Sequence, residues 1–341
     1  MIFAYFFVLF LLSIYSYSQI DLNLTLLQTP WFLSFKSALI NLGYYNRPLS
    51  TVIFTVLVLL LYIIKPKKII LAIGGVCLIS LLSYPFLSHD FFNYIFDARI
   101  VTLYHQNPYF FKALDFPNDT WIRFMQWTHR TYPYGPVWLV LTIIPSFLGF
   151  GKFILTLLNF KLLFTAAYIL NCYLVNKINP KNLKFFALNP LIILETLYSP
   201  HNEALMLTFL LLAVYLYKNK KLAVLNLFLS GGIKFLTWIL TPFIFLDREK
   251  FIKLSLILVA VGLIPVVWQR EAYPWYLVTL IGLVATIQMP KLQKFLAIFS
   301  FGLLLRYVPF LFVGSYPPEV TLVQNIITVI SLLCGLKFLL F

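Results

Sequence analysis

An aspartate at the start of the longest polar stretch of the chain has the residue type and the place of a general base. Asp90 lies in SHDFFNYIFDARI, directly after an apolar run. A carboxylate there can take the proton of a hydroxyl group as its oxygen attacks an activated carbon. Asp is also a favoured helix N-cap, so a structural role is the alternative. Asp97 and Arg99 follow within two helical turns, where they either orient a substrate or form an ordinary ion pair with each other.

A second group of polar residues interrupts the apolar segment NPLIILETLYSPHNEALML. Glu195 lies within the apolar run itself, and an ionisable residue in such a run is a functional-site hypothesis. His201, Asn202 and Glu203 follow a Ser-Pro pair and would offer an anion-binding site at the start of a helix. The alternative is an ordinary helix start, with proline in the first position and an acidic residue in the first turn.

Three cations lie in or beside other apolar runs. Lys234 follows a pair of glycines, Arg270 precedes YPWY, and Arg306 lies in a further apolar run. Cations in such places can stabilise the negative charge that develops on a phosphate group. The chain contains no HExxH, CxxC or D-x-D sequence and no phosphate-binding glycine loop. We therefore expect neither a metal ion nor a cofactor.

The composition of the 341 residues indicates what kind of protein must position these groups. Hydrophobic residues make up 61% of the chain, charged residues 11%, and the mean hydropathy is +0.90. Soluble proteins average about 45–50% apolar and about 25% charged residues. Soluble folds, disordered chains, fibres and nucleic-acid binders are therefore excluded. The sequence predicts an all-α protein, a polytopic transmembrane bundle that forms one integral membrane domain over residues 1–341.

The basic residues are distributed unevenly between the gaps that separate the apolar runs. The other stretches that connect the apolar runs hold eight of the 11 acidic residues. Because Lys-rich loops face the cytoplasm, we expect the acidic stretches, including residues 88–136, to be extracytoplasmic. Heavy use of Ile, Lys, Asn, Phe and Tyr favours a prokaryotic plasma membrane. The five gaps carry 14 of the 26 cations: Lys65, Lys67, Lys68, Lys177, Lys181, Lys184, Lys218, Lys220, Lys221, Arg248, Lys250, Lys253, Lys291 and Lys294.

Apolar runs near the roughly 20 residues that cross a bilayer recur along the chain and predict about 10–13 spans. Residues 222–246 are interrupted by Gly231, Gly232 and Lys234, and basic residues flank both ends. This stretch therefore predicts a re-entrant pair or two half-spans. Residues 88–136 form a long outer loop of the kind that is usually functional. Within it, WIRFMQWTHR (121–130) predicts an amphipathic helix on the membrane surface.

The order of these motifs resembles that of a known group of membrane enzymes. Over about residues 84–280 it is similar to the GT-C superfamily of membrane glycosyltransferases, and within it to the polyprenol-phosphate-mannose-dependent α-mannosyltransferases of actinobacteria and the first GPI-anchor mannosyltransferase of eukaryotes. The chain differs in having His89 where many relatives carry a second acid, and Ala98 in place of the usual glycine. The motifs are D-x-x-x-Y-x-x-D-x-R (Asp90, Tyr94, Asp97, Arg99), NPY (107–109), YPYGP (132–136), ALNPL with Glu195, HNEAL, a lysine after a glycine pair, and YPWY.

The resemblance implies a GT-C fold and an inverting transfer of a hexose, mannose above all, from a polyprenyl-phosphate donor to an acceptor hydroxyl. By position, Asp90 would be the base. A sugar phosphate already carries a good leaving group, so one base suffices, whereas glycoside hydrolysis calls for two carboxyl groups. The expected partners are the lipid-linked donor, a glycan or glycolipid acceptor, and membrane lipid. The expected substrate-binding residues are Asp97, Arg99, His201, Asn202, Glu203, Lys234 and Arg270.

Two other classes of protein stay open at this point. A membrane transporter fits charged residues inside apolar runs and a broken helix. The lack of internal repeats disfavours it, as does the presence of only one clear acid within a span, Glu195. A scaffold or assembly subunit is the third class, and it would tolerate replacement of Asp90.

Overall fold

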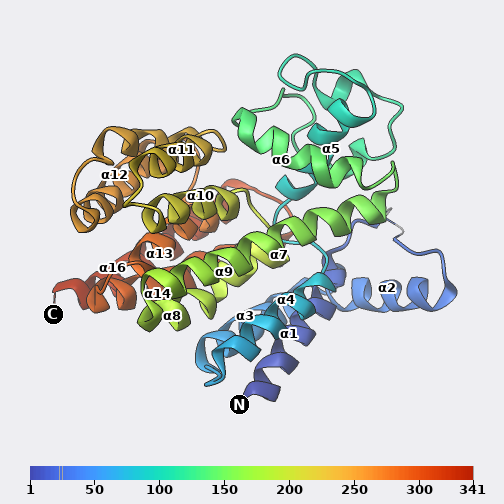
Figure 1. The fold of residues 1–341 in the computed structure, drawn as a ribbon. Coiled ribbons are helices and arrows are strands. Elements are labelled where there is room, and N and C mark those ends of the chain that lie inside the picture. Colours follow the sequence, from blue (N-terminus) through green and yellow to red (C-terminus); the bar gives the residue numbers. More distant parts are fainter. Residues whose placement is uncertain (23, 25, 341) are drawn as a thin grey trace.

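Helices form every regular element in the residues that the structure describes, which are 1–22, 24 and 26–340 (Figure 1). Within these ranges the computed structural model contains no strand. Large apolar side chains such as Val56, Ile264 and Leu333 are exposed on the outer faces of the helices. Exposed apolar surface of this extent indicates contact with lipid. The prediction of an all-α bundle of membrane helices is therefore confirmed.

The N-terminal part of the bundle consists of α1 (Ile2–Ser16), α3 (Arg47–Ile63) and α4 (Ile69–Leu81), and α1 packs against both of the others (Figure 1). A 3-10 turn, η1 (Tyr17–Gln19), follows α1. Helix α2 (Pro30–Leu42) meets α3 at 94°, so the chain turns sharply before it enters the bundle.

The centre of the bundle is built around the long helix α7 (Phe153–Ile178) and a series of short elements that follow it. These are η4 (Pro180–Asn182), α8 (Leu183–Ala187), α9 (Pro190–Ile193) and the π-helical η5 (Leu194–Tyr198). Proline at the first position of α9 ends the preceding turn and starts the new one. The wide π-helical turn changes the direction of the chain just before the HNE segment, and such turns are frequent at functional sites.

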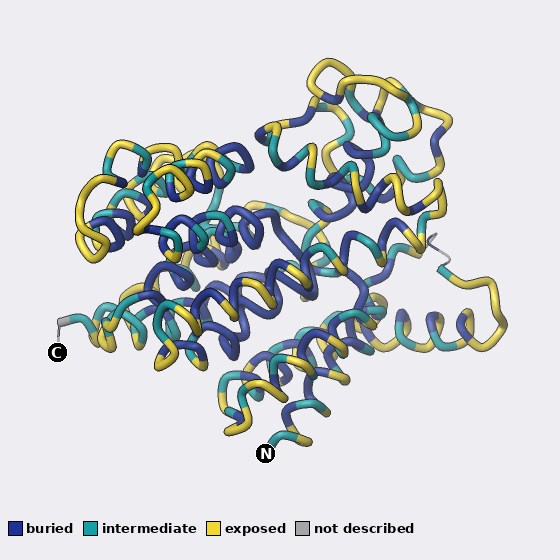
Figure 2. Tube along the Cα trace, viewed as in Figure 1, coloured by how far each residue is buried: buried dark blue, intermediate teal, exposed yellow. Residues whose placement is uncertain are grey.

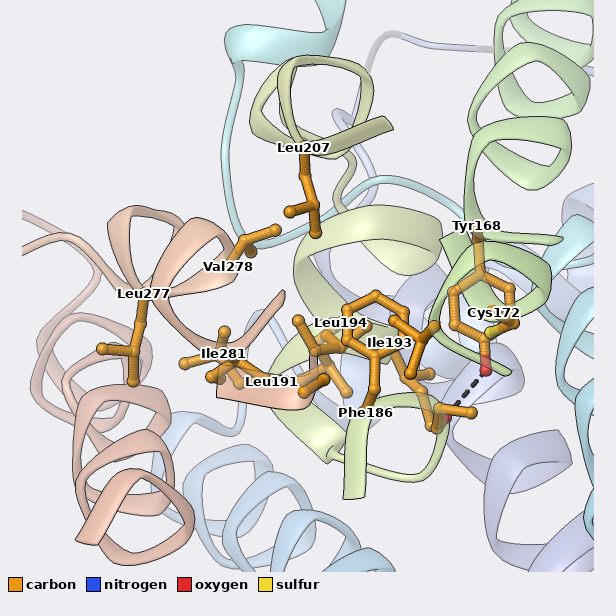
Figure 3. Packing of buried hydrophobic residues seen from close by; sticks show 14 of the residues in the cluster. Tyr168, Cys172, Phe186, Leu191, Ile193, Leu194, Leu207, Leu277, Val278 and Ile281 are labelled. Atoms are coloured by element: carbon orange, nitrogen blue, oxygen red, sulfur yellow. Dashed lines mark hydrogen bonds between the residues drawn. The ribbon is translucent and has the colours of Figure 1, made fainter. Parts of the chain in front are cut away.

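Apolar side chains from these short elements form the main hydrophobic core (Figure 3). Leu191, Ile193 and Leu194 are fully buried and lie between α7 and the C-terminal helices. The Tyr168 hydroxyl donates a hydrogen bond of 2.7 Å to the Ala187 carbonyl, which ties α7 to α8. The polar HNE segment is thus anchored to the most tightly packed part of the molecule.

The C-terminal half continues as a set of apolar helices that pack on the core and on one another (Figure 1). The last long helix, α16 (Pro318–Leu340), runs back along α14 (Pro290–Leu305), and among the described residues these two helices share the most extensive contact. The elements are α10 (Glu203–Tyr215), α11 (Lys220–Gly231), the 3-10 segment η6 (Phe235–Phe243), α12 (Arg248–Gln269), η7 (Pro274–Tyr276), α13 (Leu277–Ala285), α14 (Pro290–Leu305), α15 (Tyr307–Val313) and α16 (Pro318–Leu340).

Helices long and apolar enough to cross a membrane are fewer than the sequence suggested. There are five in the described residues, or six if the bent pair of α2 and α3 counts as one span. The number is below the expected 10–13 because several apolar runs fold as helices of 10–17 residues, among them α4, α6 (Pro136–Phe147) and α10. The five are Ile2–Gln19, Phe153–Ile178, Arg248–Gln269, Pro290–Val313 and Pro318–Leu339.

Residues 220–246 fold back on themselves. Helix α11 ends at two glycines, and a β-carbon added to Gly231 would lie 1.7 Å from the Trp238 ring, so only glycine lets η6 pack this closely. At the other end, the Lys220 ammonium donates a 2.7 Å hydrogen bond to the Ile244 carbonyl. The two ends of the stretch therefore meet, a geometry that both predicted forms share, the re-entrant pair and the two half-spans.

The outer loop, residues 88–136, begins with helix α5 (Asp90–Thr102) and leads into α6 (Pro136–Phe147). Figure 2 shows its exposed turns lying over the buried α5. Between the helices lie only the single 3-10 turns η2 (Ala113–Asp115) and η3 (Ile122–Phe124).

The predicted amphipathic helix over 121–130 is therefore wrong. Its backbone groups bond to distant parts of the loop, which offer alternatives to helical hydrogen bonds. The Gln126 amide donates to Asn93 Oδ1 at 3.2 Å, and the Thr128 carbonyl accepts from the Leu114 amide at 3.3 Å.

Candidate active site

Helix α5 begins at Asp90, whose backbone amide donates a 3.2 Å hydrogen bond to Ser88 Oγ. His89 occupies the N-cap position and makes no side-chain capping bond. The alternative role of Asp90 as the helix cap is therefore wrong, and its carboxylate is available for other partners. Helical periodicity places Asn93, Tyr94 and Asp97 on the same side of α5 as Asp90.

The Asp90 carboxyl lies between cations that come from different elements. Burial raises its pKa above the usual aspartate value, while the charges of Lys234 and Arg130 and a hydrogen bond from the Trp127 indole act against this rise. A carboxylate with a raised pKa is a better base near neutral pH than an ordinary aspartate. The surroundings of Asp90 therefore suit proton abstraction.

Glu203 and Lys234 form an ion pair next to Asp90. Glu203 is the first residue of α10, and Lys234 lies between α11 and η6. The Glu203 side chain is 3% exposed, that of Lys234 25%, so the ammonium is the accessible partner. Lys234 also lies 5.9 Å from the centre of the Tyr134 ring. The structure thus brings together three residues that are far apart in the sequence.

His201 is fully buried and lies in a stack of rings. Its ring is 4.0 Å from that of Trp275 at 16°, and Trp275 in turn stacks on Tyr273 at 4.4 Å. The His201 Nδ1 atom is 3.0 Å from Glu195 Oε2, but the two are not aligned for a hydrogen bond. Glu195 Oε1 accepts a 3.0 Å hydrogen bond from the Tyr307 hydroxyl. The YPWY motif and Glu195 therefore hold His201 in place.

The HNE segment is fastened directly to the chain that leads into α5. Ser199 Oγ accepts hydrogen bonds from the amides of Phe86 at 3.1 Å and Leu87 at 2.8 Å. This contact fixes the distance between Asp90 and Glu203, because each lies only a few residues from one of its ends.

Several buried polar atoms near Asp90 have no hydrogen-bond partner among the described residues. They include both polar side-chain atoms of Asn202, the Tyr94 hydroxyl, Glu203 Oε2 and Asn93 Nδ2. Buried polar groups are normally hydrogen-bonded to protein or to water. A cluster of atoms that the protein itself leaves unpaired indicates a place for water or a polar ligand.

Arg99 is directed away from this cluster. Its Nε donates a 2.6 Å hydrogen bond to Asp119 Oδ2, and its guanidinium lies 3.8 Å over the Trp121 ring. The expected pairing of Arg99 with Asp97 is therefore wrong, because residues two apart point to different sides of a helix. Although burial acts in the opposite direction, the bonds from Arg99, the Trp121 amide and Tyr104 hold the pKa of Asp119 below its usual value.

Arg306, one of the cations considered for phosphate binding, is occupied by protein groups. Its guanidinium donates to Glu271 Oε2 at 2.8 Å, to the Gln324 carbonyl at 2.8 Å and to Thr328 Oγ1 at 2.6 Å. These bonds join the end of α14 to α16. Arg270 is exposed and has no bonding partner among the described residues, and its charge acts on the phenol of Tyr276.

Some polar residues of this region were not singled out from the sequence. Arg130, Trp127 and Tyr134 belong to the outer loop and lie near Asp90, and the basic and aromatic character of residues 121–134 was the available signal. Lys161 lies in the apolar helix α7 and donates hydrogen bonds to Ser80 O at 2.6 Å and Ser83 Oγ at 2.8 Å, which ties α7 to the end of α4.

The cluster therefore combines a carboxylate of raised pKa, an accessible ammonium and several hydrogen-bonding groups. Among the residues with described positions, no group of three or more His, Cys, Asp or Glu side chains could hold a metal ion. The chemistry available from these side chains is proton abstraction, stabilisation of an anion and binding of hydroxyl groups.

Comparison with known proteins gives one result of direct use. A protein-family model described as alpha-(1->6)-mannopyranosyltransferase, N-terminal domain, matches residues 65–248, more than half of the chain. The matched part includes Asp90, Glu203 and Lys234. No curated protein and no solved structure matches the chain.

Proposed function

The chain belongs to the alpha-(1->6)-mannopyranosyltransferase family, and on that premise we propose that it moves mannose from a polyprenyl-phosphate donor to an acceptor hydroxyl, with inversion and with Asp90 as the base. It is a glycosyltransferase of the GT-C type with transmembrane helices. The observation that carries the proposal is the contact region of Asp90, Glu203 and Lys234. It lies within the part of the chain that defines the family.

In the proposed reaction, the acceptor oxygen attacks the anomeric carbon from the side opposite the phosphate. A carbon–oxygen bond forms to the acceptor as the bond to the phosphate oxygen breaks, and Asp90 takes the acceptor's proton. The phosphate oxygen keeps the electron pair of the broken bond. Lys234 stabilises the charge that develops there. No acid is needed for this leaving group.

The remaining residues are assigned to substrate binding. Asn202 and Glu203 provide hydrogen bonds for sugar hydroxyls, because the Asn202 side chain and one carboxylate oxygen of Glu203 have no bonding partner within the described chain. His201 lies beside them in the ring stack. Arg270 is free to approach a phosphate group from the exposed side. We leave Arg99 out of the proposed site because Asp119 occupies it.

We place the proposed site on the extracytoplasmic face of a multi-pass protein of a prokaryotic plasma membrane. The placement rests on the basic residues in the opposite gaps. Single cysteines at positions 67, 220 and 291 should react only with reagents that cross the membrane, whereas one at Asn118 should be labelled from outside. Labelling of positions 67 and 118 from the same side would contradict the placement.

The experiment that tests the function is incubation of the purified protein in detergent with a panel of polyprenyl-phosphate sugars and alkyl mannoside acceptors. We expect consumption of the mannose donor and formation of a mannosylated acceptor. A transporter for lipid-linked or small polar solutes would turn over none of these compounds, since detergent leaves no compartments. Absence of turnover with every donor would contradict the proposal.

A further inference from the structure

A small cavity lies between α5 and the outer-loop residues 125–134. Its lining includes Asn93, Asp97, Trp127 and Arg130. Of the described residues, neither Asp90 nor Glu203 nor Lys234 lines this cavity, but Trp127, which does, donates a hydrogen bond to the Asp90 carboxyl, and the charge of Arg130 acts on it. Asp90 therefore has two different neighbourhoods, one with the Lys234 ammonium and one with this cavity.

The charges around the cavity are balanced. Burial raises the pKa of Asp97 to about 8, with Asp90 adding to the rise and Arg130 opposing it. Arg130 acts on both carboxyl groups and lies 4.7 Å from the centre of the Trp127 ring. An Asp97 carboxyl that holds its proton near neutral pH both donates and accepts hydrogen bonds. Such a group suits a neutral hydroxyl better than a phosphate.

Asn93 supplies a second hydrogen-bonding group. Its side chain is 2% exposed, and Oδ1 accepts the Gln126 amide proton at 3.2 Å, which fixes the orientation of the carboxamide. Its Nδ2 has no partner among the described residues, although the residue lines the cavity. The cavity thus presents a free amide donor and a carboxyl group side by side.

The size of the cavity limits what enters it. Its volume is about 10 Å³, which is room for one water-sized group such as a hydroxyl, and it is open on one side. The rest of a ligand must lie outside, near Trp127, whose side chain is 38% exposed. Asp90, Asn93 and Asp97 follow one side of α5 over about 10 Å. A sugar with its reacting hydroxyl at Asp90 would extend along this row.

We infer that this cavity is the acceptor subsite and holds a non-reacting ring hydroxyl of a pyranoside acceptor through Asn93 and Asp97. The inference rests on the proposed function, which supplies the role of Asp90. The mannosyl phosphate then lies on the Lys234 side, and the acceptor reaches Asp90 from the Asp97 side. The charges of the two places therefore separate the two substrates. The anionic donor binds at the accessible Lys234 ammonium, and the neutral acceptor binds at the cavity, where Arg130 lies near the Asp97 carboxyl.

The test separates the two Michaelis constants. With a short-chain polyprenyl-phosphate mannose as donor and octyl α-mannoside as acceptor, Asp97→Ala should raise the acceptor KM about tenfold, the effect of losing one hydrogen bond of about 1.4 kcal/mol, and leave the donor KM unchanged. Asn93→Asp keeps the acceptor atom for Gln126 and should also raise the acceptor KM. Asp115→Ala removes an exposed carboxylate from the same loop and should change neither constant.

Acceptors that lack the 2-, 3- or 4-hydroxyl identify the bound group. With one of these deoxy acceptors the acceptor KM of the wild-type enzyme should be about tenfold higher than with octyl α-mannoside. In Asp97→Ala the two acceptors should have the same KM, because removing the hydroxyl and removing the carboxyl group abolish the same contact. A rise of the donor KM alone, or losses that simply add for every deoxy acceptor, would overturn the inference.

Equilibrium binding of octyl α-mannoside distinguishes failure of this inference from failure of the proposed function. A protein that binds the mannoside, loses this binding in Asp97→Ala and yet consumes no donor would contradict the function and support the subsite. Unchanged binding in Asp97→Ala would overturn the subsite.

Discussion

Arg306 and Lys234 are both cations held among apolar helices, yet their surroundings differ. The Arg306 guanidinium donates hydrogen bonds to groups of α16 and to Glu271. The Lys234 ammonium bonds to Glu203 alone among the described residues, and polar atoms of Glu203 and the adjacent Asn202 have no partner in that part of the chain. Arg306 is thus surrounded by protein groups that accept its hydrogen bonds, whereas Lys234 lies beside polar atoms that still lack a hydrogen-bond partner.

The difference teaches how to separate a structural charge from one that serves a substrate. A buried polar atom without a partner costs about 1–3 kcal/mol. Folding alone would not favour several such atoms at one place. Around Arg306 the hydrogen bonds join two helices, so that protein groups occupy the guanidinium and leave none of its charge for a substrate. Around Lys234 the remaining bonding capacity is directed to a region that also contains Asp90.

The largest loss of stability that this comparison predicts follows from replacement of Arg306. Arg306→Met leaves the Glu271 carboxylate and the α16 acceptors unpaired and should lower the free energy of unfolding by about 3 kcal/mol. The donor KM should not change. Thermal denaturation and donor kinetics of the purified variant check this, and a raised donor KM at unchanged melting temperature would return Arg306 to the phosphate site.

At Lys234 the expected effect is on activity. Lys234→Met removes a charge-assisted contact to the donor phosphate of about 1.5–3 kcal/mol, so donor turnover should fall at least about tenfold. Because the change also leaves Glu203 unpaired, the double variant Lys234→Met/Glu203→Gln should regain stability. It should not regain turnover. Recovery of normal turnover in the double variant would show that Lys234 serves only the packing of Glu203.

The smallest effect is expected at Arg99, which pairs with Asp119 in the outer loop. Arg99→Gln should lower the free energy of unfolding by about 1 kcal/mol at neutral pH. Since the pKa of Asp119 is lowered in the fold, this stabilisation is present above the unfolded pKa of about 3.9 and is lost as the pH falls through the lower folded value. The melting temperatures of wild type and variant should therefore converge in acid. A difference independent of pH would assign the effect to the Trp121 contact instead.

The helical class followed from the composition, and the grouping of Asp90, Glu203 and Lys234 was implied by the resemblance that the order of the motifs shows. The partners of Arg99 and Arg306 did not follow, since Asp119 and Glu271 meet them only through the folded chain. The helix expected over residues 121–130 was wrong for the same reason: bonds to Asn93 and Leu114 replace its own turns. Local patterns indicate elements, but long-range contacts decide which polar group is free.

Lys161 is a second ionisable residue within an apolar run, and its position alone does not show whether its role is structural or functional. It lies in an apolar run, as Glu195 does, and by that criterion deserved the same functional hypothesis. The structure assigns its ammonium to Ser80 and Ser83 of the α4 end. A charge inside a span is therefore a reason to look for partners, and the partners decide between a structural and a functional role.

The central claim is that Asp90 acts as the base, and the most direct measurement compares Asp90→Asn with Asp90→Ala for transfer rate and melting temperature. General-base catalysis contributes about 10²–10⁴-fold, so Asp90→Asn should transfer mannose at least about a hundredfold more slowly while it still binds the donor and melts like the wild type. Asp90→Ala should be equally slow. An Asp90→Asn enzyme with near-normal transfer, together with an Asp90→Ala enzyme that is mainly less stable, would contradict the claim and leave Asp90 a structural role at the start of α5.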